Sequence, residues 1–434
     1  MPGTSDPSSG GKSDALKVSP IVELARSGSD RKLGVALFTV NKSGEISGAG
    51  RPSFEYNGRQ YGVPRLPRTL QDSLILPDAF HQFGSTRKLF DSILALFQKH
   101  TALSEKTTSL LTYWSISTWF PDFVPLFPTL ELEGSAQAVD SIFRTMRAVC
   151  RRPILIADFS SALFRTFPVG ELMPTLLIRD PQLNKRMASL LDASTQPGYL
   201  VSTGKDLQRL YCPKCVYVGD VRSDPLQAKT SIQIQVEIDP AKRIPPPPKE
   251  DVVTEFQNRL ITYRLFVHDK VAESVFRVPD FRPEIRAVAE VLGATIVNDE
   301  ELRHKLIDLL KERDEQSRVD RAVGLKGTVV RAVLSHCHQG EQEKVYVRDI
   351  AATVNQIYIE EGESLRVSSE TVGHVLKSLG LYSRRLGNAG RGLMLENSMQ
   401  SQAHRLGSAY DVLPAEPACG YCQRTQVSDS KDLV

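Results

Sequence analysis

Residues 127–144, FPTLELEGSAQAVDSIFR, decide the fold of this chain. Thr129–Leu132 reads as an apolar strand, the residues around Gly134 as a turn, and those from Ala136 to Cys150 as an amphipathic helix. Strands and helices alternate in the same way up to residue 238, over short connections. This alternation predicts an α/β core around a mostly parallel sheet. The further strand candidates are Ile154–Ala157, Thr175–Ile178, Val216–Val218 and Ser231–Ile238.

The strand, turn and helix of residues 127–150 have the layout of a phosphate-binding loop. Such a loop uses glycines to wrap the phosphates, a Lys for the β/γ-phosphates and a Ser or Thr for Mg²⁺. Here Gly134 and Ser135 remain, but no Lys follows them. In an ATPase, the strand at 174–178 would end in an acidic residue that holds the metal. In this chain Arg179 takes that place and Asp180 follows it, and a cation there repels Mg²⁺. We therefore expect a degenerate nucleotide site of Gly134, Ser135 and Asp180, with no ATP hydrolysis and no cofactor.

The rest of the chain divides around this core. Short β-like runs with Asn and Gly turns precede it, and the proline run Pro245–Pro248 marks its end. The predicted division is a disordered tail (1–30), a small β-rich module (31–85), a helical lead-in with the degenerate P-loop core (86–244), a helical lid (249–320), a winged helix (321–400) and a tail (401–434).

The winged-helix prediction rests on three helices followed by a β-hairpin. We expect the helices near Gly327–Ser335, at Val347–Ile359, and from Ser368, as N-cap, to Leu379. A hairpin follows over Leu381–Leu395, with its turn at 387–390. Three helices and a two-stranded wing are the parts of a winged helix-turn-helix.

Basic residues gather in this segment, and no acidic residue occurs between Thr371 and Leu395. The third helix would turn its polar side chains to a DNA major groove, and the wing would place cations near phosphates or a minor groove. The alternative is a winged helix that docks proteins and is basic only for solubility. The predicted DNA contacts are Ser369, His374, Lys377, Arg384, Arg385 and Arg391.

Two Cys-x-x-Cys pairs have the spacing of a zinc half-site. Cys212 and Cys215 precede an apolar strand, so buried structural cysteines are the simpler interpretation. Cys419 and Cys422 lie in a short tail and need further ligands. The two pairs together, or either one with His404 and the segment His336–His338, would complete a zinc site. The sequence selects none of these combinations.

The order of these parts resembles bacterial P-loop proteins of mobile elements that are related to poxvirus-type and virulence-associated-E-type primase-helicases. The resemblance covers about residues 86–396 and implies a helicase/AAA+-like P-loop fold, ATP with Mg²⁺, and action on DNA in replication or transposition. It rests on Leu111–Trp119, Leu132-Glu133-Gly134-Ser135, Cys150-Arg151-Arg152-Pro153, Ala162-Leu163-Phe164-Arg165, Pro174–Ile178 and Leu381–Leu395.

Composition limits the alternatives. A formal net charge of +3 is too small to indicate nucleic acid by itself, and no run of 18 apolar residues predicts a membrane span. We expect a cytoplasmic protein without a membrane partner. The leading hypothesis is a non-hydrolysing, helicase-like DNA-binding component of a mobile-element or replication-type assembly, with a protein partner or a homo-oligomer. The alternatives are a regulatory or scaffold subunit of an active ATPase without firm DNA binding, and an enzyme with a repurposed nucleotide pocket.

Overall fold

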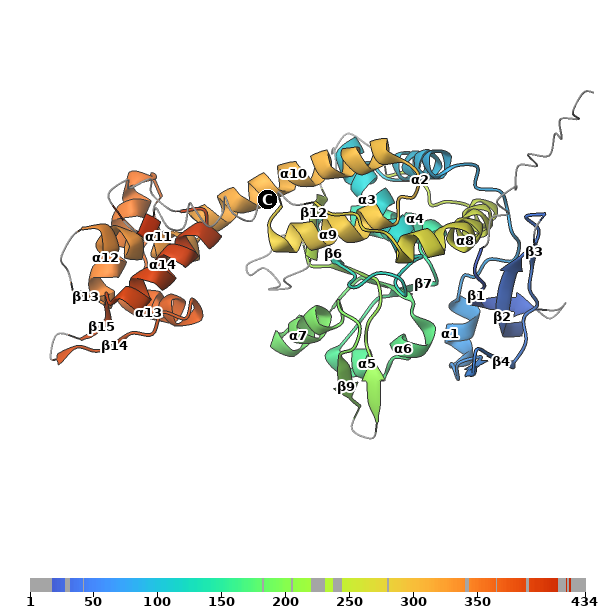
Figure 1. Cartoon of the computed structure of the whole chain (residues 1–434), viewed down its shortest axis with the longest axis horizontal. Coiled ribbons are helices and arrows are strands. Elements are labelled where there is room, and N and C mark those ends of the chain that lie inside the picture. Colours follow the sequence, from blue (N-terminus) through green and yellow to red (C-terminus); the bar gives the residue numbers. More distant parts are fainter. Residues whose placement is uncertain are drawn as a thin grey trace, which may run out of the picture. The chain divides into compact units, whose positions relative to one another are not determined.

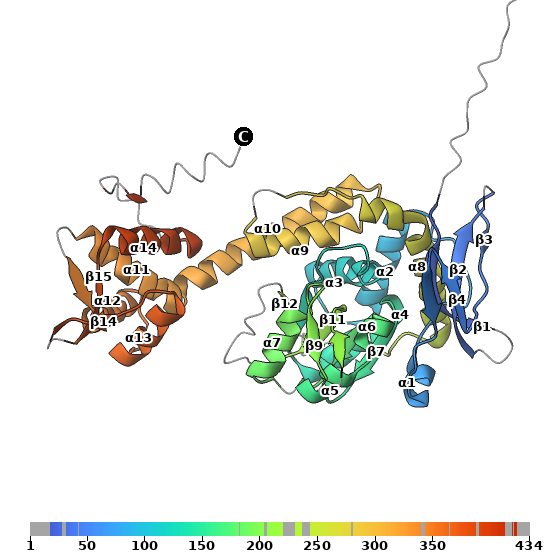
Figure 2. The ribbon, with the colours of Figure 1, turned by 60° about the horizontal axis from the view of Figure 1, so that its bottom comes forward.

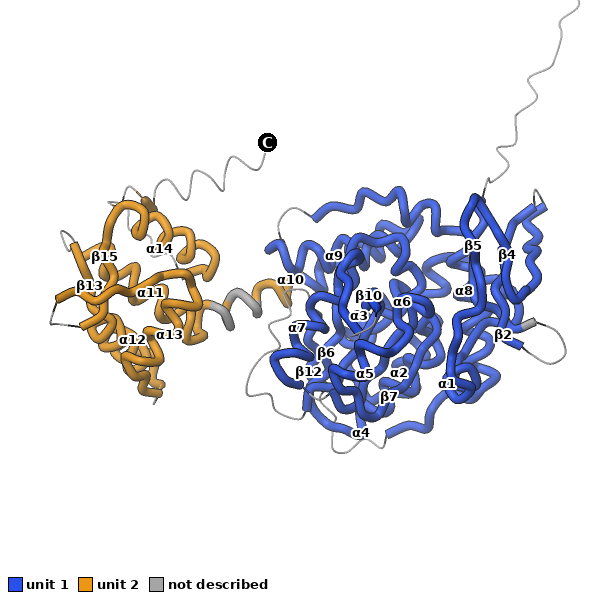
Figure 3. The backbone as a smooth tube through the Cα atoms, turned by 90° about the horizontal axis from the view of Figure 1, so that it is seen from below, with its two compact units in different colours: residues 1–310 blue, residues 311–434 orange. Residues whose placement is uncertain are grey.

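The computed structural model divides the chain into two compact units, residues 1–310 and 311–434 (Figure 3). None of the described helices has the length and hydropathy that a membrane span requires. The described residues are 18–27, 32–41, 43–181, 183–203, 206–219, 231–236, 244–278, 281–339, 343–363, 365–387, 390–412, 419, 421 and 422.

Within the described residues, the first unit is built on a five-stranded sheet in the order β12-β6-β11-β8-β7, and every neighbouring pair is parallel. This confirms the prediction of an α/β core with a parallel sheet. The order differs from the dinucleotide-binding order 3-2-1-4-5-6 and from the flavodoxin-like order 2-1-3-4-5. The strands are β6 (Thr129–Gly134), β7 (Pro153–Ile156), β8 (Thr175–Ile178), β11 (Lys214–Tyr217) and β12 (Ser231–Val236). Residues 237 and 238, which we assigned to the last strand, lie outside the described part.

Each face of this sheet supports its own hydrophobic core, because successive side chains of a strand point to opposite faces. Leu177 and Tyr217 belong to one core, while Ile178 and Val216 belong to the other. The first core includes residues of α2 (Thr86–His100), α3 (Glu105–Ser117), α4 (Ala136–Val149), α8 (Glu250–Ala272), α9 (Pro283–Ala294) and α10 (Glu300–Val323). The second includes residues of α5 (Ser161–Thr166), α6 (Val169–Leu172) and α7 (Lys185–Ala193), and Figure 1 shows these helices away from the first group.

The N-terminal part of this unit corrects one prediction. We expected residues 1–30 to be a disordered tail, but β1 (Ile21–Ser27) pairs antiparallel with β2 (Lys32–Val40) along its whole length (Figure 2). The strand escaped prediction because its stability depends on a distant partner: Glu23, a charged residue at its centre, is buried against arginines from other elements. The remaining small elements are β3 (Ile46–Ser47), β4 (Ser53–Tyr56), β5 (Arg59–Gly62), α1 (Arg68–Ser73), β9 (Leu200–Ser202) and β10 (Leu207–Arg209).

The second unit contains the three helices and the hairpin that the sequence predicts, together with a strand that it did not predict. β13 joins the hairpin in an antiparallel sheet of the order β13-β15-β14. Ser368 caps α13 as expected, since its Oγ accepts a hydrogen bond of 3.2 Å from the amide of Thr371. The elements are α11 (Leu325–His338), β13 (Lys344–Tyr346), α12 (Val347–Glu360), α13 (Ser369–Ser378), β14 (Arg384–Arg385), β15 (Arg391–Met394) and α14 (Asn397–Ala409).

Candidate functional site

The predicted nucleotide site lies at the carboxyl ends of the parallel strands, where ligands of open α/β sheets bind. Gly134 ends β6 with φ +119°, and a Cβ on it would come within 2.4 Å of the carbonyl oxygen of Val236. Its amide donates a 2.9 Å hydrogen bond to the carbonyl of Gly219. Gly134 therefore serves the close approach of two neighbouring segments, and its N–H is engaged within the protein rather than directed at a phosphate.

Arg179 is held in place at the same end of the sheet. It follows Ile178 in β8, so its side chain lies on the face that α4 covers. Its Nε donates a 2.7 Å hydrogen bond to Oδ1 of Asp140 on α4, and its guanidinium lies 4.6 Å from the ring centroid of Tyr217 on β11. An ion pair and a cation–π contact thus fix a positive charge at the strand ends.

The other two predicted residues contribute less. Ser135 is the N-cap residue of α4, and the described residues give its side chain no capping hydrogen bond. The side chain of Asp180 is exposed, while its backbone carbonyl accepts from the amide of Phe159. Sequence reasoning missed Asp140 and Tyr217. Asp140 carried a usable signal, as a carboxylate on the helix that follows the turn.

A hollow in the second unit collects most of the predicted DNA contacts. It has a volume of about 660 Å³. All six predicted residues are exposed, as a predicted DNA contact requires. Four of them line the hollow: Ser369, His374, Lys377 and Arg391. Arg384 and Arg385 are not among the described residues that line it.

The outward side chains of α13 are opposite its core side chains, as the helical spacing predicts. Val372 and Leu376 are fully buried in the hydrophobic core of the unit. Gly373, His374 and Lys377 face the hollow, so α13 presents one open face.

Among the residues of the hollow that were not predicted are Tyr346, Arg348 and Tyr382. Tyr346 ends β13 and Arg348 lies at the start of α12, and the Arg348 guanidinium lies 5.1 Å from the Tyr346 ring centroid. Tyr382 is 71% exposed and offers a ring surface to a partner. The described lining thus combines Arg348, Lys377 and Arg391 with one carboxylate, Glu370. Tyr346 and Arg348 precede α13 by a whole helix, so sequence proximity gave no signal for them.

The wing carries the remaining cations. Arg385 is the cross-strand partner of Arg391, which places it next to a residue of the hollow. Arg391 is anchored by a 3.2 Å hydrogen bond from its Nε to Oγ of Ser383. Arg384 forms a 3.2 Å ion pair with Glu396, and both side chains are more than half exposed. Exposed pairs of this kind are worth about 0–1 kcal/mol, so Arg384 can exchange its partner for a phosphate at little cost.

The two cysteine pairs have different environments. Cys212 and Cys215 are buried in the core of the first unit, and burial raises the pKa of the Cys212 thiol to about 11. Lys214 between them is also buried, and its Nζ donates to the carbonyls of Ser194 and Cys212. Among the described residues, neither cysteine belongs to a group that could hold a metal. This pair therefore fits the structural interpretation.

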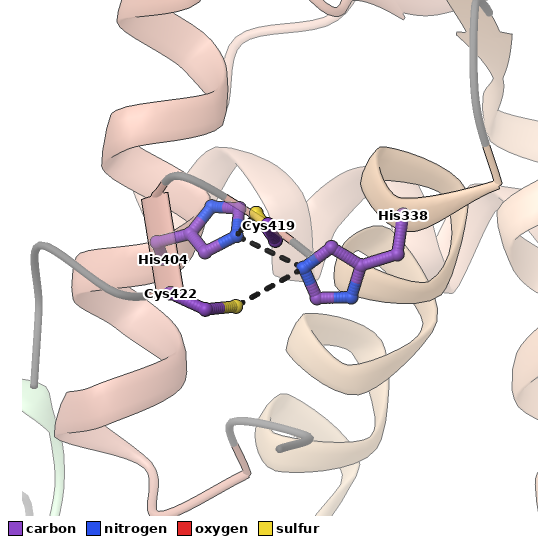
Figure 4. Close-up of side chains that lie close together, drawn as sticks. All are labelled: His338, His404, Cys419 and Cys422. Carbon is purple, nitrogen blue, oxygen red and sulfur yellow. Dashed lines mark hydrogen bonds between the residues drawn. The ribbon is translucent and has the colours of Figure 1, made fainter. Parts of the chain in front are cut away.

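Cys419 and Cys422, in contrast, meet His338 and His404 in the second unit. The ligand atoms of these four side chains all lie within 4.8 Å of one another (Figure 4). This group could hold a metal ion. The sequence offered all four residues as candidates but could not select their combination.

Comparison with known proteins gives no family. No family model matches the chain, and no curated protein is similar to it. Solved structures with partial similarity include a full-length MCM homolog from Methanopyrus kandleri (TM-score 0.33, 11% identity, 68% of this chain and 77% of that one). A second is the apo NrS-1 C-terminal region, with a TM-score of 0.32 and 9% identity over 86% of this chain and 97% of that one. A third is Drosophila ORC bound to DNA, with a TM-score of 0.20 and 10% identity over 80% of this chain and 96% of that one. At such TM-scores the likeness supports no argument about fold or function.

Proposed function

We propose that this protein binds DNA through a winged helix in its C-terminal unit and does not hydrolyse ATP. The observation that supports DNA binding is the hollow itself, where Lys377, Arg391 and Arg348 converge from α13, β15 and the start of α12. Cations on three separate elements around one concave surface suit a polyanion whose charges recur along a backbone.

In this proposal, α13 is the recognition helix. Its N-terminal residue Ser369 and its outward residues His374 and Lys377 contact base edges in the major groove. Arg384, Arg385 and Arg391 on the hairpin contact phosphates or a minor groove. The exposed ring of Tyr382 adds a stacking surface for an unpaired base.

The core of the first unit acts in the proposal as a scaffold or oligomerisation surface of a mobile-element or replication-type assembly. Catalysis of phosphoryl transfer depends on a Lys and a metal that neutralise the phosphates. Arg179, which pairs with Asp140, stands where the sequence pattern predicts a metal-binding carboxylate, and no Lys follows Gly134. A phosphate-release assay with and without DNA should show no turnover. Turnover that Asp180→Ala abolishes would contradict this part.

A second candidate function is a regulatory subunit that docks proteins instead of DNA. Glu370 in the hollow and the Arg384–Glu396 pair favour it, because both reduce the local positive charge. A third candidate, an enzyme that uses the nucleotide pocket for another purpose, predicts that a nucleotide raises the melting temperature of the chain.

The deciding experiment is salt-dependent DNA binding by the full chain. We expect Lys377→Glu with Arg391→Glu to lower the affinity and to reduce the slope of log K against log salt by about 1.8, because each phosphate contact contributes about 0.9. The matched control is Lys311→Glu with Lys326→Glu, which makes the same charge change at exposed positions outside the described lining of the hollow. Equal slopes for the two double variants would refute DNA binding at this surface and favour the protein-docking function.

A further inference from the structure

Four side chains from three separate places in the second unit converge on one point. His338 is the last residue of α11, His404 lies on α14, and Cys419 and Cys422 come from the C-terminal segment (Figure 4). The two Nε2 atoms are 3.0 Å apart. Sγ of Cys419 lies 3.3 Å from Nε2 of His404, and Sγ of Cys422 lies 3.4 Å from Nε2 of His338.

These three distances match three of the six edges of a tetrahedron around zinc. With Zn–N near 2.05 Å and Zn–S near 2.3 Å, a tetrahedral ion separates two nitrogens by about 3.3 Å and a nitrogen from a sulfur by about 3.6 Å. Each observed distance is within about 0.3 Å of its ideal value. As hydrogen bonds, these three contacts would require each Nε2 atom to serve two partners at once. A single tetrahedral ion accounts for all of them together.

The surroundings of His404 orient it as a metal ligand. Its Nδ1 lies 2.7 Å from the backbone carbonyl of Gln400, so Nδ1 carries the proton and Nε2 presents its lone pair to the group. A backbone carbonyl on the second nitrogen is the usual support of a metal-bound histidine. Tyr421, between the two cysteines, packs its ring 5.4 Å from the His404 ring and donates from its hydroxyl to Oδ1 of Asn397 at 2.9 Å. These contacts hold Tyr421 against α14.

The composition and burial of the group indicate a structural role. Two thiolates and two imidazoles are a ligand set of structural zinc sites. His404 is 1% exposed and Cys422 is 4% exposed. Four protein ligands complete the tetrahedron, so a substrate or a catalytic water has no coordination position.

We propose that His338, His404, Cys419 and Cys422 bind one zinc ion, which fastens the C-terminal segment to α11 and α14. This inference is independent of DNA binding, because none of the four residues lines the hollow of α13 among the residues described there. Zinc would tie together three parts of the chain that the sequence separates widely, and α11 and α14 both belong to the core of this unit.

The test is the metal content of the full chain, expressed with zinc and purified without a metal-affinity step. We expect one zinc per chain in the wild type and at least a tenfold loss in Cys419→Ser with Cys422→Ser. The matched control, Cys212→Ser with Cys215→Ser, removes the other Cys-x-x-Cys pair and should retain the zinc. A second control, Cys337→Ser, changes the thiol next to His338 and should also retain it.

Two further variants keep the test informative if the double serine variant folds poorly. His404→Cys preserves four ligands and should retain zinc, whereas His404→Ala should lose it. Cobalt bound in place of zinc should show the visible absorption of a tetrahedral site with two thiolates. Wild-type protein without metal, or with Cys419 and Cys422 joined in a disulfide, would overturn the proposal. Undiminished zinc in the Cys419/Cys422 variant would overturn it equally.

Discussion

Glu23→Gln should be among the most destabilising single substitutions in the first unit. Glu23 is 4% exposed and accepts hydrogen bonds from Arg264 Nε at 2.7 Å, from Arg151 Nη2 at 2.8 Å, and from Arg152. Asp122 provides a second carboxylate, which pairs with Arg264. In this group, two carboxylates offset most of the charge of the three guanidiniums, which are all buried.

The substitution leaves three buried cations with one carboxylate. Removal of one partner from a buried ionic group costs about 3–5 kcal/mol, because the remaining charges stay desolvated without compensation. A domain of ordinary stability has about 5–15 kcal/mol in total. Glu23→Gln should therefore remove a large part of the free energy of unfolding of the first unit. It should also loosen β1, since Glu23 links this strand to Arg151, Arg152 and α8.

Urea denaturation of the full chain measures this effect. The control is Glu55→Gln, which changes the same functional group on the exposed strand β4 and should stay within about 0.5 kcal/mol of the wild type. A loss below about 1 kcal/mol for Glu23→Gln would refute the reasoning, because it would mean that the three arginines find other partners or water.

The same group gives a pH dependence of defined sign. Burial by itself would raise the pKa of Glu23, but the charges of Arg151, Arg152 and Arg264 outweigh burial and hold the pKa well below its ordinary value of 4.5. The unfolded chain therefore binds this proton first as the pH falls. The stability that Glu23 contributes is complete above its unfolded pKa and is lost as the pH falls toward the folded value. The difference between wild type and Glu23→Gln should shrink progressively below about pH 5.

Three further predictions concern single positions. Ser368→Ala should lower the free energy of unfolding of the second unit by about 1 kcal/mol, since it removes the cap of α13. The neighbouring Ser369→Ala should change this free energy little. Equal effects of the two variants in a urea titration would argue against the cap. Glu370→Gln should raise the DNA affinity of the full chain at low salt, because it removes the carboxylate of the hollow. The control Glu363→Gln should leave the affinity unchanged. A lower affinity of Glu370→Gln would indicate instead that Glu370 accepts a hydrogen bond from a base. Burial lowers the pKa of Lys214 from 10.5 to about 8, so the folded state releases this proton before the unfolded state as the pH rises. The wild type should therefore gain stability relative to Lys214→Met as the pH rises from about 8 to about 10.5. A constant difference in the free energy of unfolding between the two proteins over this range would contradict the burial of a charged Lys214.

The sequence by itself was sufficient for most of the secondary structure. The strand predicted at 175–178 has the predicted bounds, and the helix predicted over 347–359 spans residues 347–360, since each pattern repeats within a few residues. The capping of α13 by Ser368 was also predictable, because it depends only on residues close to it in the sequence. β1 was missed because its seven residues contain a central charge that only distant arginines make tolerable.

The candidate sites show where local reasoning ends. The helical period placed His374 and Lys377 on the open face of α13. Only the tertiary structure joined Arg179 to Asp140, and the C-terminal cysteines to His338 and His404. Helix and strand periods depend on neighbours a few positions away, so a sequence displays them directly. A buried ion pair or a set of metal ligands depends on which distant segments pack together, and that choice is made by the hydrophobic cores of the whole fold.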